Sequence, residues 1–544
     1  MPSLPKISSA RTDRLHASWR ARFSPDATSL VLLVLLLLAA HLLLWTLLTG
    51  ISHRSPDLDN MEELVWGSVI EWGYYKHPPL PSWIIYGLTS VFGRSVWVTF
   101  FAGQLSVVLS LWMVWRLGCE MTSQKNALIA TLLIMPITYY TTRGLISNHN
   151  TLQLWSIAGC IWMFYRSWRY ERMRDWLGLG IFCGIALLSK YSVVVQFAVF
   201  FLFLLIDGRL RYARVWKGIA LAAAPLLLMM LPHVLWLQRQ VMTPVGYASE
   251  SLTRESTRLE NLEMVLDMLT TTLARLAPML LALLVIVWWQ RRRISAALAT
   301  DAPAGRGIRL SESLRPEDRK FILLVGLGPL VLTLVAVLIL KAPLIADWTT
   351  SYYMLFGFFA FWCLNADRPG TGKPTSSALL RICLTVIVTI QLCTVIGYAL
   401  VRGPLSDMFG YATRANFPGE DISLAMQQEW RSHVNTPLTL VASDTWLGGN
   451  IAVHASRDVR VLIDGDVEKS QWVTAEQAAS CGMLLALNRS DDAADGIPPK
   501  VEELMLQAKW RGTLQLPATR KMDGPQVIVE WGIIAPTAAC RPGT

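Results

Sequence analysis

Residues 56–80 concentrate side chains that could do chemistry at a membrane surface. The stretch ends in the run Trp72-Gly-Tyr-Tyr-Lys-His-Pro-Pro-Leu80, and its carboxylates are Asp57, Asp59, Glu62, Glu63 and Glu71. Acidic groups beside a bilayer lose hydration energy and are repelled by anionic head groups. A dense group of them therefore indicates proton transfer or cation binding rather than an ordinary solvated surface.

The spacing of Asp59, Glu62 and Glu63 places three carboxylates on neighbouring positions of one helical turn. An Asp followed three residues later by Glu also imitates a capping box, so helix capping is the alternative role for Asp59. The prolines at 78 and 79 favour an extended backbone, along which aromatic side chains and Lys76 can line a groove. Function is therefore the better interpretation of the loop as a whole.

The composition indicates which elements hold this loop. The chain has 544 residues, 53% hydrophobic and 16% charged, whereas about 25% charged is usual in soluble proteins. Apolar runs of roughly 17 to 25 residues, long enough to cross about 30 Å of hydrocarbon, recur along it. We predict eleven membrane spans, near 28–49, 95–116, 126–142, 151–167, 176–189, 192–206, 217–237, 268–289, 321–340, 349–365 and 378–401. The 176–206 stretch is alternatively a single bent helix.

The placement of lysine and arginine predicts the orientation. With 1–26 as a basic cytoplasmic N-terminus, the inside segments carry 25 lysines and arginines and the outside segments carry 9. This positive-inside bias puts an outer catalytic loop at 51–94. Residues 80–93 would invert the bias as a span, so we predict an interfacial helix there. We see no basic stripe interleaved with aromatic residues, and we expect no nucleic-acid partner.

Residues 403–544 differ from the rest and indicate a small extracytoplasmic α/β domain. Its strand-like runs are 438–442, 459–463 and 526–530, and its helical stretches are 422–433, 474–479 and 500–508. Cys481 and Cys540 both fall in this domain. They could pair in an oxidising compartment or stay free, because the sequence gives no separation between them.

Two motifs resemble those of bacterial glycosyltransferase family 39, in the dolichyl-phosphate-mannose mannosyltransferase clan, which includes lipid A aminoarabinose transferases. One is an acidic residue after the first span followed by the Trp72–Leu80 run; the other is Gly178-Leu-Gly-Ile-Phe-Cys-Gly-Ile-Ala-Leu-Leu-Ser-Lys190-Tyr191. The resemblance covers about residues 25–400. It implies a polytopic α-helical membrane protein of GT-C type with about 11–13 transmembrane helices, here residues 27–402. It also implies a polyprenyl-phosphate sugar as donor.

Within that resemblance Asp59 matches the loop carboxylate used near the acceptor. The commonest pattern has a second acid at the next position, where this chain has Asn60. We therefore predict Asp59 as the catalytic residue, with Glu62 and Glu63 as reserves.

A further acidic position of the family falls in the second outer loop, where only Asn148, His149 and Asn150 are available. Amides and one imidazole are poorer ligands for a hard cation than carboxylates. No cofactor is certain, and dependence on a divalent cation stays an open question.

A sugar transferase also needs cations that stabilise the departing phosphate. The candidates are Lys76, Lys190 and Arg143. Lys190 is the strongest candidate, because an unpaired ammonium between two apolar stretches costs desolvation free energy. The alternative explanation for Lys190 is that its side chain snorkels to the membrane interface. For Arg143 we favour plain head-group anchoring.

Further side chains are predicted to line the substrate: Trp72, Tyr74, Tyr75, His77, His149 and His233. Aromatic belts at membrane interfaces and packed, hydrogen-bonded histidines are their alternative explanations.

Taken together, these features predict a multi-pass glycosyltransferase of the bacterial inner membrane, hexosyl or pentosyl. It would move a sugar from undecaprenyl phosphate to an envelope acceptor, lipid A or another glycan or lipid, with Asp59 as general base and with inversion. A lipid-linked-sugar flippase or transporter is the alternative, although it would need charged residues facing each other in mid-membrane. An inactive, scaffold-like relative is the third possibility, given Asn60 and Asn150.

Overall fold

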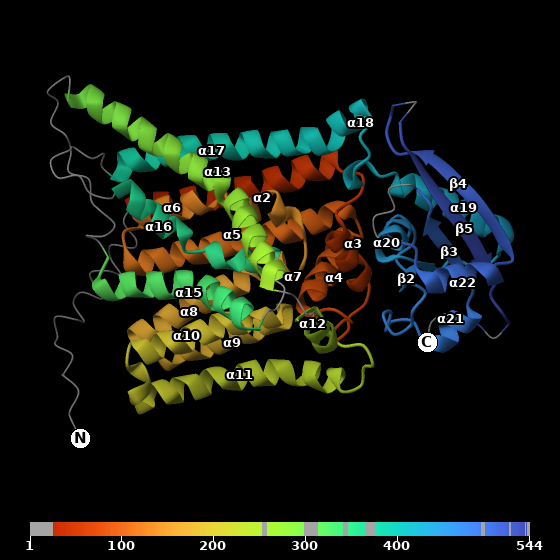
Figure 1. The fold of residues 1–544 in the computed structure, drawn as a ribbon, viewed down its shortest axis with the longest axis horizontal. Helices are drawn as coiled ribbons and strands as arrows, with labels where there is room; N and C mark the ends of the chain where they lie inside the picture. The colour runs from red at the N-terminus through yellow and green to blue at the C-terminus, as the bar shows by residue number, and fades with distance from the viewer. Residues whose placement is uncertain are drawn as a thin grey trace.

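The computed structural model describes residues 25–252, 258–298, 314–340, 346–365, 376–490, 496–521, 524–538 and 540. The chain forms a long helical bundle with a smaller, sheet-bearing part at one end (Figure 1). Most of the predicted N-terminal segment 1–26, and much of two further segments near 295–319 and 366–376 that the positive-inside bias places on the same side, lie outside the described residues.

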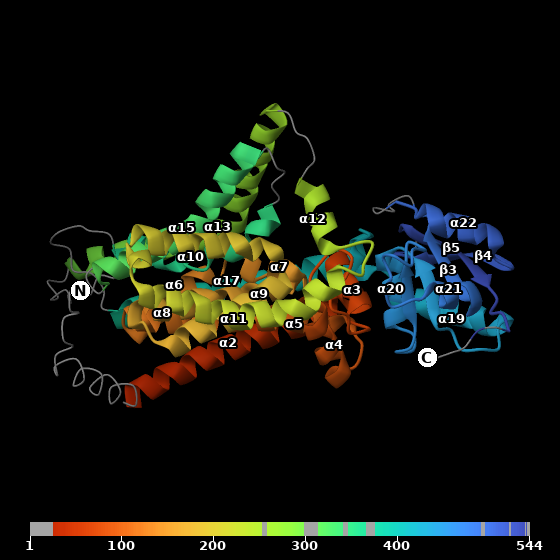
Figure 2. The ribbon, with the colours of Figure 1, turned by 90° about the horizontal axis from the view of Figure 1, so that it is seen from below.

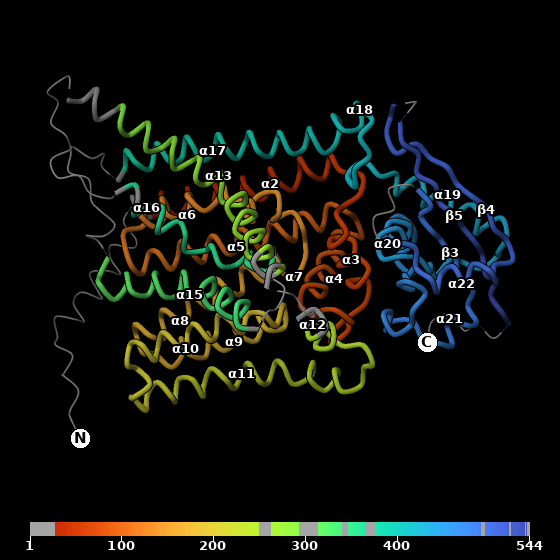
Figure 3. The backbone as a smooth tube through the Cα atoms, viewed as in Figure 1, coloured from red at the N-terminus to blue at the C-terminus, as the bar shows by residue number. Residues whose placement is uncertain are grey.

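Each of the eleven predicted spans contains a helix. The bundle helices are α2 (Pro25–Ser52), α5 (Val96–Met121), α6 (Gln124–Ile134), α8 (Leu154–Tyr170), α9 (Met173–Ser189), α10 (Val194–Ile206), α11 (Ala213–Leu237), α13 (Arg258–Leu298), α15 (Pro316–Leu340), α16 (Phe356–Asn365) and α17 (Ser376–Leu400). Among the described residues, 6 helices are long and apolar enough to cross a membrane, namely α2, α5, α11, α13, α15 and α17. The protein is a multi-pass membrane protein. The backbone trace shows α2 and α17 side by side along one edge (Figure 3).

The other five helices are shorter because irregular backbone interrupts the apolar runs. After α6 the chain forms two 3-10 turns, Thr138–Tyr140 and Arg143–Leu145, and a further 3-10 segment, Ala346–Tyr353, precedes α16. Such backbone is tolerated at membrane depth only where protein or a polar cavity surrounds it. A 3-10 turn, Tyr191–Val193, separates α9 from α10, so 176–206 forms two helices rather than one bent helix.

Four short helices lie outside these spans: α3 (Leu58–Trp66), α4 (Leu80–Phe92), α7 (His149–Leu152) and α12 (Pro244–Leu252). The helix predicted over 80–93 forms as α4, and its position at the membrane interface stays a prediction. Figures 1 and 2 both place α3 and α4 between the bundle and the sheet-bearing part. The carboxylate-rich stretch 56–80, which we call the acidic loop, is therefore enclosed from two sides.

The C-terminal part is an α/β unit, as the sequence predicts. Its strands are β1 (Leu440–Ser443), β2 (Arg460–Ile463), β3 (Met483–Asn488), β4 (Trp510–Pro517) and β5 (Gln526–Ile534), in the order β2-β1-β3-β5-β4. Strand β1 runs parallel to β2 and β3, while β5 is antiparallel to β3 and β4. The helices are α18 (Ser406–Phe409), α19 (Gly419–His433), α20 (Thr445–Val453), α21 (Ala475–Ser480) and α22 (Pro499–Gln507). Cys481 and Cys540 form a disulfide.

Helix α20 holds this part against α3. A Cβ on Gly449 would lie 2.4 Å from Cγ of Met61, so only glycine permits this close approach. Two buried hydrogen bonds cross the same contact: Trp446 Nε1 donates to the Pro56 carbonyl at 3.1 Å, and Ser55 Oγ donates to Asn450 Oδ1 at 2.7 Å. The acidic helix and the C-terminal sheet thus share one packed core.

Candidate active site

Helix α3 begins at Leu58, with Asp57 at the N-cap position. Asp59 therefore lies inside the first turn, so the alternative of Asp59 as the capping residue does not apply. Its Oδ2 accepts a hydrogen bond from Asn148 Nδ2 at 2.7 Å. The Asn148 side chain also caps α7, because its Oδ1 accepts from the backbone N–H groups of Asn150 and Thr151, both at 3.0 Å. One asparagine thus fixes α7 and orients the candidate base.

Lys190 lies in extended backbone between α9 and α10, and its ammonium donates to Asn150 Oδ1. Its Nζ is also 5.6 Å from the ring centroid of Trp348. Burial lowers the pKa of Lys190 to about 7, against the opposing attraction of Asp59 and Asp347. We call Asp59, Asn148, Asn150 and Lys190 the inner cluster.

Arg143 forms an ion pair with Asp347, and Arg275 Nη2 lies 3.7 Å from Oδ1 of the same carboxylate. The 3-10 segments described above place Arg143 and Asp347 here. Sequence reasoning did not select Asp347 or Arg275. The only available signal for Asp347 was a carboxylate next to Trp348 at the outer end of a predicted span.

Asn60, where the family pattern has a second acid, is a buried structural residue. Its Nδ2 donates to Thr99 Oγ1 at 2.8 Å and to the Leu145 carbonyl at 2.9 Å. A carboxylate could not donate to either acceptor. The amide is therefore what this packing requires, and Asn60 is not a substitute acid.

The two reserve carboxylates are engaged elsewhere. Lys76 Nζ donates to Glu62 Oε1 at 2.6 Å, and Ser82 Oγ lies 2.7 Å from Glu63 Oε2. Burial raises the pKa of Glu62, with Lys76 opposing, and it raises the pKa of Glu63 well above its usual range. A raised pKa disfavours the ionised form that a base needs. Both glutamates are thus poorly suited to replace Asp59 as the base.

Two predicted lining residues, Tyr74 and His233, are fully buried. Tyr74 stacks on Trp66 with ring centroids 5.3 Å apart, and its hydroxyl donates to the Val69 carbonyl at 2.8 Å. His233 contacts the Tyr191 hydroxyl through Nε2 and the Trp72 carbonyl through Nδ1, which ties α11 to the acidic loop. Both residues therefore support the loop.

The other predicted lining residues are accessible to different degrees. Trp72 is 42% exposed and packs edge-on against Trp83, while Tyr75 is half-buried beside Lys76. The rings of His77 and His149 are only 3.4 Å apart between centroids. Burial lowers the pKa of both histidines well below the usual range, and Lys190 and Lys76 lower it further. Both are therefore neutral at pH 7.

The arrangement does not fit a resident metal ion. Among the described residues no group of three or more His, Cys, Asp or Glu side chains is placed to hold one. Beside Asp59 the structure has a donating amide and the ammonium of Lys190. A further cation there would be repelled by Lys190.

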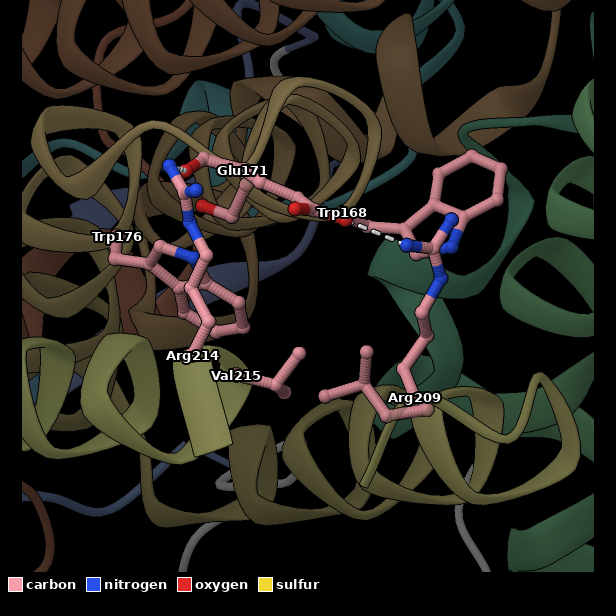
Figure 4. Close-up of a pocket in the computed structure, with 8 residues that line it drawn as sticks. Trp168, Glu171, Trp176, Arg209, Arg214 and Val215 are labelled. Atoms are coloured by element: carbon pink, nitrogen blue, oxygen red, sulfur yellow. Dashed lines mark hydrogen bonds and ion pairs between the residues drawn. The ribbon is translucent and has the colours of Figure 1, made fainter. Parts of the chain in front are cut away.

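A small pocket at the other end of α9 is a weaker candidate. It is lined by Ser167, Trp168, Glu171, Trp176, Leu204, Arg209, Arg214 and Val215 (Figure 4). Arg209 pairs with Glu171 at 2.6 Å and with Asp207 at 3.1 Å, and Arg214 donates to the Glu171 carbonyl at 3.0 Å. The two arginines of this pocket are thus engaged with protein groups. The pocket lies near the start of α9 and Lys190 follows its end, so the two are separated by the length of the helix, about 25 Å.

Comparison with solved structures identifies the architecture. ArnT from Cupriavidus metallidurans in the apo state superposes with a TM-score of 0.57 at 12% identity, over 93% of this chain and 98% of ArnT. The same protein bound to undecaprenyl phosphate gives a TM-score of 0.55 at 13% identity, with the same coverage. The chain has the GT-C fold.

Sequence comparison confirms the resemblance inferred from the motifs. Residues 76–236 of this chain match the family model described as dolichyl-phosphate-mannose-protein mannosyltransferase. That stretch contains Lys76, His149 and Lys190, and it begins after Asp59.

Two curated relatives come from Rhizobium johnstonii. The lipopolysaccharide core galacturonosyltransferase RgtA is 29% identical over 209 residues, which is 37% of this chain and 41% of RgtA. RgtB, with the same description, is 25% identical over 429 residues, which is 76% of this chain and 80% of RgtB. The match thus spans less than half of RgtA and most of RgtB.

Proposed function

We propose that the protein is a membrane glycosyltransferase that moves a sugar from a polyprenyl phosphate to an acceptor of the bacterial cell envelope. The observation that carries the proposal is the inner cluster: a carboxylate and an ammonium, each held by an asparagine of one loop. The match to a mannosyltransferase family model and the galacturonosyltransferase relatives support the same class of reaction. We infer a lipopolysaccharide core or lipid A acceptor, with galacturonic acid as the first donor sugar to test.

In the proposed mechanism, Asp59 removes the proton from an acceptor hydroxyl. The resulting oxygen attacks the anomeric carbon and forms the new glycosidic bond, while the bond from that carbon to the phosphate oxygen breaks on the opposite face. The configuration inverts, and the phosphate leaves on its polyprenol with the electron pair. Lys190 and Arg143 stabilise the charge that develops on the phosphate.

The position of these groups supports surface chemistry over transport. Asp59, Lys190 and Arg143 lie at ends of helices or in connecting turns, on the side where α3 meets the C-terminal part. A flippase would instead need such groups near mid-membrane. We propose that this side faces the periplasm of an inner-membrane protein, and the Cys481–Cys540 disulfide agrees with an oxidising compartment.

The test is mass spectrometry of envelope lipids from cells with the gene, without it, and with Asp59→Asn. We expect deletion and Asp59→Asn each to remove a sugar adduct. The matched control is Asp57→Asn at the N-cap position of the same helix. This variant should keep the adduct, because the Asp57 side chain makes no capping hydrogen bond and its ion partner is Arg402, at 3.9 Å, rather than a residue of the inner cluster.

Two results would count against the proposal. If Asp59→Asn keeps the adduct that deletion removes, Asp59 is not the base. If deletion changes no glycan, the protein is not this transferase.

A further inference from the structure

In the C-terminal sheet, the carboxyl ends of β1 and β2 lie toward the acidic loop. Strands β1 and β2 are parallel, and open α/β sheets bind ligands beyond the carboxyl ends of such strands. At the end of β1, Asp444 caps α20, which packs on α3. At the end of β2, the chain turns through Asp464-Gly465-Asp466. Both carboxyl ends therefore lie on the side of α3.

The turn after β2 presents an ion pair to Tyr75. Lys469 Nζ donates to Asp464 Oδ2 at 2.6 Å and lies 6.0 Å from the ring centroid of Tyr75. From the acidic loop, Lys76 Nζ lies 5.3 Å from the same centroid. One aromatic ring thus meets an ammonium from each part of the molecule. We call Glu62, Tyr75, Lys76, Asp464 and Lys469 the seam cluster.

The seam cluster remains accessible to a ligand. The side chains of Lys76, Asp464 and Lys469 are 27%, 31% and 28% exposed. Asp464 is also close enough to act on the acidic loop: after the larger effects of burial and Lys76, it raises the pKa of Glu62. The acidic loop and the C-terminal part therefore interact electrostatically at the seam cluster, in addition to packing against each other.

The protein holds this turn in a defined conformation. Asp464 has a φ of 54°, a left-handed backbone that costs energy for a residue other than glycine and is least unfavourable for Asp and Asn. The Asp464 N–H donates to the Ser443 carbonyl at 2.8 Å, and the Ile463 N–H donates to Ser470 Oγ at 2.7 Å. In the same segment, Gln471 buries both atoms of its amide without a partner in the described structure. The turn is thus preorganised, and the unpaired amide of Gln471 leaves polar groups in this segment that a ligand or water would satisfy.

We propose that Asp464 and Lys469, together with Tyr75, form the subsite that binds the acceptor saccharide. The inference rests on the proposed glycosyl transfer and adds the C-terminal part to it. The pair has no net charge, and it offers one accepting and one donating side chain beside a partly exposed aromatic ring. This combination suits neighbouring hydroxyls on a sugar, because the carboxylate accepts from one hydroxyl while the ammonium donates to the next.

A second lysine in the same unit provides a matched control. Lys500 donates to Asp466 Oδ2 at 2.7 Å, so it makes an ion pair like that of Lys469 only two residues from Asp464. No contact joins Lys500 to the acidic loop among the described residues. A change at Lys500 thus reports the cost of losing such a pair without touching the seam cluster.

The experiment uses the full chain in lipid nanodiscs, with undecaprenyl-phosphate galacturonic acid as donor probe and lipopolysaccharide core as acceptor probe. For Lys469→Met we expect a rise of about tenfold in acceptor KM, with kcat and donor KM nearly unchanged. Asp464→Asn, which tolerates the left-handed backbone, should raise acceptor KM similarly. Lys469→Arg should recover most of the loss, and Lys500→Met should match the wild type.

The outcomes separate this inference from the proposed function. If Lys469→Met behaves like Lys500→Met, or raises donor KM as much as acceptor KM, the acceptor subsite is wrong while glycosyl transfer stands. If the wild type transfers sugar from neither this donor nor other polyprenyl-phosphate sugars, the proposed function fails, and the subsite fails with it.

Discussion

The inner cluster and the seam cluster are adjacent, but they differ in their balance of positive and negative side chains. Around the inner cluster, three cations (Arg143, Lys190 and Arg275) face two carboxylates, Asp59 and Asp347. In the seam cluster two ammoniums match two carboxylates. An excess of positive charge suits a step in which phosphate develops negative charge, whereas a balanced set suits recognition of hydroxyls. This difference agrees with the proposal that the inner cluster carries the chemistry and the seam cluster binds the acceptor.

The largest expected effect tests the charge of the inner cluster. Lys190→Met should lower kcat by about a hundredfold, because a donor to the developing phosphate charge is lost. With its pKa lowered to about 7, Lys190 is charged below that pH and neutral above it, so the wild-type rate should fall as pH rises through neutrality. The measurement is kcat against pH.

Two variants sharpen this pH test. Lys190→Arg, which stays charged, should abolish the alkaline fall. Asn150→Asp, which places a carboxylate against the ammonium, should move the fall to higher pH. An unchanged alkaline limb in both variants would show that Lys190 does not control the profile.

A smaller effect should follow from releasing Asp59. Asn148→Ser keeps a side chain that can cap α7 but removes the amide that donates to Asp59. We expect kcat to fall about tenfold while both KM values and the melting temperature change little. Steady-state kinetics and a thermal melt decide the matter. A large loss of thermal stability with unchanged kcat would make Asn148 a structural residue only.

The smallest effect should come from changing the apolar contact between α20 and α3, which leaves every polar group in place. Gly449→Ala places a methyl group 2.4 Å from Cγ of Met61 and should raise acceptor KM a few-fold through a shift of α20. Donor KM should stay constant in the same assay. The double variant Met61→Ala with Gly449→Ala should restore acceptor KM, because it removes the obstructing atoms. If the double variant is as impaired as the single one, the clash is not the cause.

Much of this arrangement was predictable where the signal is local. The spacing of Asp59, Glu62 and Glu63 predicts the helix that α3 forms, and the apolar flanks of Lys190 mark it as unusual. The β-rich runs and the separate helix at 80–92 follow from short-range pattern as well.

The rest depends on contacts between distant segments. Asn148 meets Asp59 across 89 residues, and Arg143 meets Asp347 across 204 residues. No local pattern encodes such pairs, and the sequence placed Arg143 and Asp347 just beyond the ends of two predicted spans without indicating that the two residues meet. Nothing in the sequence placed the turn at Asp464-Gly465-Asp466 against Tyr75.

The shortness of α6 and α16 also bears on how the protein is made. Helix α6 has 11 residues and α16, within the described residues, has 10, so each described helix covers about 15 Å, roughly half of the hydrocarbon core. They pack directly on each other, with Gly357 of α16 against the Ala130 carbonyl of α6. Helix α6 also packs against α5, which precedes it, so its packing starts with α5 and is completed only by a partner more than two hundred residues later. Fragments that end before α16 should therefore lack one of the contacts that enclose α6.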